Sequence, residues 1–84
     1  MPTTITTKNR NQLGDAYQAA EDLYDTARNL ALLLEVYSAR PEIGSFSTES
    51  LEYIQTNIAQ AAIHLQALQE HLTRLGVLPA ETTS

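Results

Sequence analysis

The two histidines of this 84-residue chain, His64 and His71, are candidates for metal binding or acid–base chemistry. They are seven residues apart, so a helix would place both on one face with about 10.5 Å between their backbone positions. That separation is too long for one metal ion within a chain. The residues three positions before them are Ala61 and Leu68, where a di-iron site in a helical bundle takes a carboxylate. We therefore predict no metal site and interpret both histidines as residues at the edge of a core.

The segment HLTRLG, residues 71–76, resembles the motif of histidine phosphotransfer proteins. In that family, the phosphorylated histidine is followed three residues later by a basic residue and just afterwards by a glycine. Here Arg74 takes the basic position, while Gly76 comes one residue late and at a helix end. A histidine phosphotransfer-like or other His-dependent component, using His64 or His71, is therefore an alternative function.

Four carboxylates lie close together in the sequence: Asp15, Glu21, Asp22 and Asp25. A pair of carboxylates performs acid–base catalysis when a pocket pushes the two pKa values apart, and the contact between two helices offers no such pocket. Acidic side chains near the N-terminal end of a helix are favoured by the helix dipole. We therefore interpret this cluster as a solvated face, and we predict no catalytic residue, no cofactor and no enzymatic activity.

Charge and composition narrow the choice of partner. Ten acidic and five basic side chains give a formal net charge of −5, and no run of Lys or Arg supplies the positive surface that nucleic acid or an anionic membrane requires. The longest apolar run, residues 30–34, is far shorter than the roughly 20 residues that cross a bilayer. The chain has no cysteine, which fits a reducing compartment, and residues 1–12 lack the apolar core of a signal peptide. We therefore expect a cytoplasmic protein.

The elements that position these side chains follow from the apolar spacing. From Arg10 onward, apolar and small residues recur at spacings of three and four, which indicates an amphipathic helix. This helix is predicted over about 10–39, because Pro41 keeps Arg40 out of the helical conformation. The column predicted to face a neighbouring helix is Leu13, Tyr17, Ala20, Tyr24, Ala27, Ala31, Leu34 and Ser38. A second column beside it is Ala16, Leu23, Leu30 and Tyr37.

A second helix is predicted over about 48–75, after a turn at 40–47. Ser47 is suited to cap its first backbone N–H groups, Gly76 to end it in a left-handed conformation, and Pro79 to prevent its continuation. Its apolar column has heptad spacing throughout: Leu51, Ile54, Ile58, Ala61, Leu65, Leu68, Leu72 and Leu75.

Two helices of about 28 residues joined by a short turn must lie antiparallel. The predicted fold is therefore all-α, an antiparallel two-helix hairpin over 10–78. Residues 1–9 are predicted as a flexible N-terminal tail and residues 79–84 as a disordered C-terminal tail.

The pairing across the turn places Leu30 opposite Ile58 and Leu23 opposite Leu65. A single hairpin of this length offers only a small core. We therefore predict that two copies form a homodimer, a four-helix bundle.

One segment, NLALLLEVYS at residues 29–38, holds more apolar residues than the two columns of the first helix can bury. Leu32, Leu33 and Val36 lie off both columns and are expected to point outward. Burying each is worth roughly 1.5–3 kcal/mol, so we expect another surface to cover them. The predicted interaction or dimer surface is Leu30, Leu32, Leu33, Val36, Tyr37, Ile43 and Phe46. Whether a second copy or a target covers it is left open by the sequence.

These observations predict a small acidic protein–protein interaction module that binds, and so bridges, regulates or inhibits, a larger unidentified protein. In this respect the chain resembles the small acidic helical proteins of bacteria and phages that occlude or bridge a target. Its outline is also similar to that of the small secreted helical hairpins with a Trp-x-Gly turn, but its own turn reads PEIGSF and contains no Trp. A purely structural assembly subunit is the remaining alternative.

Overall fold

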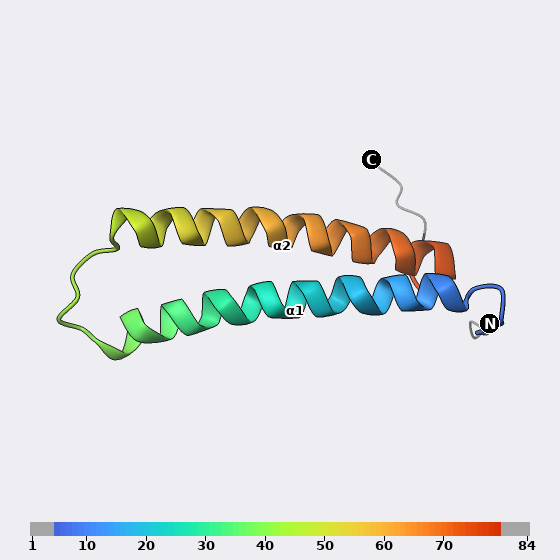
Figure 1. Cartoon of the computed structure of the whole chain (residues 1–84), viewed down its shortest axis with the longest axis horizontal. Helices are drawn as coiled ribbons and strands as arrows, with labels where there is room; N and C mark the ends of the chain where they lie inside the picture. The colour runs from blue at the N-terminus through green and yellow to red at the C-terminus, as the bar shows by residue number, and fades with distance from the viewer. Residues whose placement is uncertain (1–4, 80–84) are drawn as a thin grey trace.

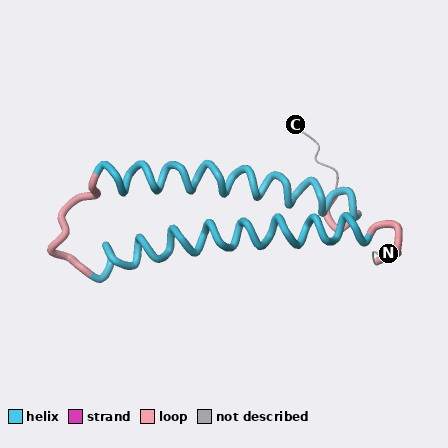
Figure 2. Tube along the Cα trace, in the orientation of Figure 1, coloured by secondary structure: helices cyan, strands magenta, loops and turns pink. Residues whose placement is uncertain are grey.

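The protein is a hairpin of two long α-helices in the computed structural model, which describes residues 5–79. Helix α1 spans Arg10–Ala39 and helix α2 spans Thr48–Leu75. The two helices lie side by side and run in opposite directions, with the connecting loop at one end of an elongated molecule of 54 × 30 × 20 Å (Figure 1). Within the described residues the chain contains helices, turns and loops but no strand (Figure 2). The all-α hairpin predicted from the sequence is confirmed.

The ends of α2 carry the capping groups that the sequence indicates. The Ser47 side chain accepts a hydrogen bond from the Ser50 backbone N–H at 3.1 Å, which satisfies one of the free donors in the first turn. At the other end Gly76 has a φ of 84°, in the left-handed region. The N–H of Gly76 bonds to the Thr73 carbonyl and that of Val77 to the Leu72 carbonyl, both at 3.0 Å. This pair of bonds is a Schellman motif.

A hydrogen-bonded turn leads into α1. The Thr6 N–H donates to the Asn9 side-chain oxygen at 2.8 Å, and the Asn9 N–H donates back to the Thr6 hydroxyl at 3.3 Å. The segment predicted as a flexible tail therefore contains a defined turn just before the helix. The remaining residues of the predicted tails, 1–4 and 80–84, lie outside the described residues.

Two hydrogen bonds between side chains join the helices near their ends. Near the loop, the Tyr37 hydroxyl bonds to the Ser50 hydroxyl at 2.9 Å. At the far end, the Gln12 side-chain oxygen bonds to Nδ1 of His71. These pairs fix how α1 and α2 are aligned along their lengths.

The core is small. The buried apolar residues are Ala16, Ala19 and Leu75, and they are joined by two buried polar residues, Thr26 and Asn57. In a two-helix structure a side chain is covered mainly by the other helix, so burial identifies the contact between the helices, which we call the seam. Most of the large apolar side chains of the chain lie outside it.

The rotation of α1 about its axis differs from the prediction. Its seam residues are buried or half-buried: Ala16, Ala19, Leu23, Thr26, Leu30, Leu33 and Tyr37. The column predicted to face a neighbour in the hairpin is wrong, because Tyr17 is 63% exposed and Tyr24 is 62% exposed. The second predicted column is the one that lies in the seam.

The predicted column of α2 is also only partly covered. The seam residues of this helix are Ser50, Ile54, Asn57, Ala61, His64, Leu68, His71 and Leu75. Leu51, Ile58 and Leu65 belong to the predicted column but are exposed. The expected partners of Leu30 and Leu23, which are Ile58 and Leu65, are therefore not buried residues of the seam.

Candidate interaction surfaces

Six large apolar side chains form one exposed side of the hairpin, which we call the apolar face: Tyr17, Tyr24, Leu34, Leu51, Ile58 and Leu65. Each directly follows a seam residue in the sequence, as Tyr17 follows Ala16 and Ile58 follows Asn57. One residue is a rotation of about 100° about the helix axis. Because α1 and α2 run in opposite directions and face each other, the same rotation turns both columns to the same side of the hairpin.

The apolar face carries no charged side chain along most of its length. On α1 the positions between its large residues are Ala20, Ala27 and Ala31. On α2 they are Gln55 and Ala62, and Gln69 is the next position after Leu65. The sequence pattern places Tyr17, Tyr24 and Leu34 in the contact between the two helices, so it does not predict this exposed surface. The heptad spacing of these residues does predict that they face another helix. It does not predict whether that helix is the other one of the same hairpin.

Five of the carboxylates lie on the opposite side, which we call the acidic face. Each of these carboxylates directly precedes a seam residue, so it is rotated from the seam by about 100° in the direction opposite to the apolar face. They are Asp15, Asp22, Asp25, Glu49 and Glu70. The two broad sides of the hairpin therefore differ in character, since one is apolar and uncharged and the other carries negative charge. The predicted solvated acidic cluster of α1 contributes three members of this face.

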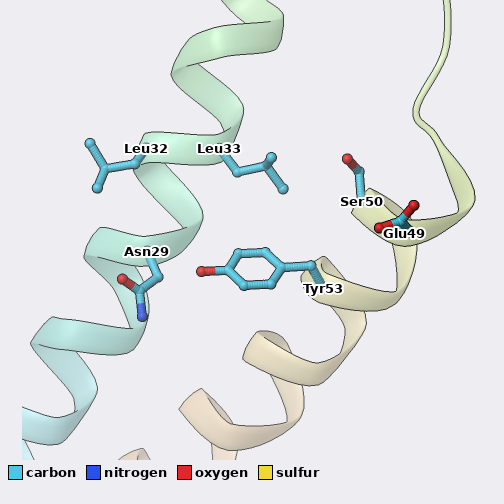
Figure 3. A pocket seen from close by; sticks show the side chains of 6 residues that line it. All are labelled: Asn29, Leu32, Leu33, Glu49, Ser50 and Tyr53. Carbon is cyan, nitrogen blue, oxygen red and sulfur yellow. The ribbon is translucent and has the colours of Figure 1, made fainter.

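The seven residues predicted as an interaction surface are divided by the fold. Leu30, Leu33 and Tyr37 are half-buried in the seam. The prediction that Leu33 points outward is wrong, since its side chain is directed toward α2 (Figure 3). The exposed members, which we call the loop-end patch, are Leu32, Val36, Ile43 and Phe46. Leu32 precedes a seam residue and so lies on the same side as the carboxylates, away from the apolar face.

An open groove of about 480 Å³ lies between the helices near the loop. Its walls are Asn29, Leu32, Leu33, Glu49, Ser50 and Tyr53. The Tyr53 ring extends from α2 toward Asn29 of α1, while Leu32 is directed away from α2 (Figure 3). The groove therefore joins the loop-end patch to the acidic face.

Tyr37 fixes the loop to the start of α2. Its ring packs against Phe46 with 4.4 Å between ring centroids and 40° between ring planes. Its hydroxyl contacts the Ser50 hydroxyl at 2.9 Å and accepts a hydrogen bond from the Ser47 N–H at 3.4 Å. Hydrogen bonding by the Ser50 side chain, and then by Ser47, lowers the pKa of Tyr37 below its usual value of 10.0. The loop-end patch is thus built on an ordered frame.

The histidines lie in the seam rather than in a pocket. His64 is half-buried, and the His71 ring is engaged by Gln12 across the hairpin. Among residues 5–79 no three His, Cys, Asp or Glu side chains are placed so that they could hold a metal ion. These positions give both rings a packing role in the hairpin.

No protein-family model, curated protein or solved structure matches this chain. Neither described helix has an apolar stretch long enough to cross a membrane.

Proposed function

We propose that this chain is a small protein–protein interaction module without catalytic activity of its own. It pairs with a second copy to complete a four-helix bundle, and it binds a larger protein through the loop-end patch. Binding of the bundle bridges, regulates or inhibits that protein.

The observation that carries this proposal is the mismatch between the buried core and the apolar content of the helices. Among residues 5–79, only three apolar residues, Ala16, Ala19 and Leu75, are buried. Ten of the large apolar side chains that stay exposed belong to the apolar face or the loop-end patch. Full burial of one such side chain is worth roughly 1.5–3 kcal/mol, so association with other surfaces is the main source of stability open to this chain.

The target surface is defined by what surrounds the loop-end patch. Glu35, Glu42 and Glu49 are exposed near its apolar residues, with Arg40 as the neighbouring basic residue. A complementary partner presents an apolar centre with a basic rim, since interfaces pair opposite charges around an apolar core. Because Leu32 points away from the apolar face, a second copy on that face leaves the patch free.

Two measurements on the full chain test the proposal. Sedimentation equilibrium at 10–100 μM should give twice the 9.3 kDa mass of one chain. A tagged chain should capture a protein from its native host, and the double substitution Leu32→Glu and Val36→Glu should abolish this capture while leaving the doubled mass intact. The matched control is Ile63→Glu, at an exposed position in the middle of α2, which should retain capture.

Self-association and target binding are contradicted by different results. A stably folded monomer at 100 μM contradicts self-association. Undiminished capture of the same protein by the double variant contradicts binding through the loop-end patch.

A further inference from the structure

We infer that the apolar face of Tyr17, Tyr24, Leu34, Leu51, Ile58 and Leu65 is the surface on which the second copy sits. This inference rests on the self-association proposed above and assigns it to one side of the hairpin. The loop-end patch and the acidic face then remain outside the dimer.

The apolar column of α2 supports this inference, because it is rotated about the helix axis away from the side of α2 that contacts α1. From Leu51 to Leu68 the unbroken column alternates between exposed residues and seam residues, and it ends with the half-buried Leu72 and the buried Leu75. A column that served the hairpin alone would be centred on the seam. In a four-helix bundle each apolar column points to the bundle axis, midway between two neighbouring helices. The offset is therefore the one expected for a second pair of helices on the apolar face.

Helix α1 shows the same offset. A heptad column runs along it, in which four members lie in the seam, Leu13 and Ala20 are half-buried at its edge, and Ala27 and Leu34 are exposed. The four seam members are Ala16, Leu23, Leu30 and Tyr37. The column's spacing of three and four is maintained from one end of the helix to the other. Both helices thus present a complete bundle column of which α1–α2 contact covers only part.

The size of the face fits another hairpin. An aromatic side chain has an area near 150–250 Å² and the four aliphatic side chains are smaller, so six side chains that are 44–63% exposed expose roughly 500 Å². The alanines and glutamines of the face add to this. A stable interface of standard size takes about 800 Å² from each partner. A covering surface must also be as long as the helices, and a second pair of 30- and 28-residue helices has that length.

The charge distribution favours a second copy, rather than a basic partner, as the molecule that covers the apolar face. The apolar face is uncharged, whereas the helical carboxylates lie on the opposite or outer sides. A basic target would be attracted to those carboxylates and not to this face. Two chains of formal net charge −5 approach each other at the lowest cost through their uncharged sides.

Ile58 and Ile63 give a matched pair of probes. Both are isoleucines of α2, 55% and 65% exposed, but Ile58 lies on the apolar face and Ile63 on the opposite side. At an exposed helical position, replacement of isoleucine by alanine is neutral or stabilising, because alanine has the higher helix propensity. At a position covered by a second copy the same replacement removes buried contacts from both chains.

The experiment measures the dimer dissociation constant by sedimentation, and folding by circular dichroism, for the full chain and for the variants Ile58→Ala and Ile63→Ala. Ile58→Ala should raise the dissociation constant about hundredfold, and Ile63→Ala should leave it unchanged within about threefold. If Ile58→Ala fails to fold while Ile63→Ala folds normally, the inference is supported as well, because only a covered isoleucine has that effect.

Two results overturn the inference. One is a wild-type dimer that Ile58→Ala does not weaken, and the other is a dimer that Ile63→Ala weakens as strongly. Either result leaves self-association standing and moves it to another side of the hairpin. A wild-type chain that stays monomeric contradicts the proposed self-association itself.

Discussion

At the level of single residues, Ser47 stabilises the hairpin at the point where the loop enters α2. Its hydroxyl accepts the Ser50 N–H at 3.1 Å and also bonds to the Ser50 hydroxyl at 3.0 Å, while its own N–H donates to the Tyr37 hydroxyl. One short polar side chain therefore caps the helix and joins the group that holds α1 to α2. This arrangement makes the capping bond part of the tertiary structure.

Replacing this cap should have a measurable cost. Ser47→Ala removes the side-chain acceptor, and loss of such a cap lowers the free energy of unfolding by about 1 kcal/mol. The thermal midpoint should fall by about 4–8 °C for a domain of this size. The control is Ser45→Ala, two residues earlier in the exposed loop, which should unfold like the wild type in a calorimetric scan. An equal fall in both variants would show that the loop as a whole, and not the cap, sets the stability.

At the level of the elements, the buried polar residues of the seam, Thr26 and Asn57, form their hydrogen bonds within one helix and not between the helices. The Thr26 hydroxyl donates to the Asp22 carbonyl at 2.9 Å, and the Asn57 side-chain amide donates to the Tyr53 carbonyl at 2.8 Å. Each bond lies within its own helix. These buried groups are satisfied, so they are tolerated, but they supply less stabilisation than apolar side chains of similar size.

An apolar replacement in the seam should therefore stabilise the hairpin. Thr26→Val keeps the shape of the side chain and removes a hydroxyl that makes no bond to α2, so we expect the free energy of unfolding to rise by about 0.5–1 kcal/mol. Thr56→Val, on the exposed side of α2, is the control and should change it little. Urea unfolding at one fixed protein concentration measures both. A loss of stability in Thr26→Val would mean that its hydroxyl contributes more than the bond to Asp22.

The bounds of the helices could be predicted from the sequence, but the rotation of each helix about its axis could not. The ends of α2 were predictable because Ser47 and Gly76 act on their nearest backbone groups, and the end of α1 followed from Pro41. The rotation of the helices was not predictable in the same way. Heptad spacing predicts that residues such as Leu34 and Ile58 face another helix, but it does not predict whether that helix belongs to the same chain. Leu33 was misplaced for this reason.

At the level of the whole molecule, the apolar face and the acidic face lie on opposite sides of the hairpin. The apolar face is free of charge, and Asp15, Asp22, Asp25, Glu49 and Glu70 lie on the opposite side. In a dimer joined through the apolar faces these carboxylates are on the two outer surfaces. In such a dimer the carboxylates of one copy repel those of the other across the bundle. The uncharged apolar faces offer no ion pair to offset that repulsion.

This arrangement predicts that salt strengthens the dimer. Raising NaCl from 10 to 150 mM shortens the screening length from about 30 to about 8 Å, so repulsion between two chains of formal net charge −5 weakens. We expect the dissociation constant measured by sedimentation to fall about three- to tenfold. The double variant Glu21→Gln and Glu52→Gln, with a formal charge of −3, should dimerise more tightly at low salt and respond less to added salt. A dimer that salt weakens would instead be held by ion pairs, which the uncharged apolar face does not supply.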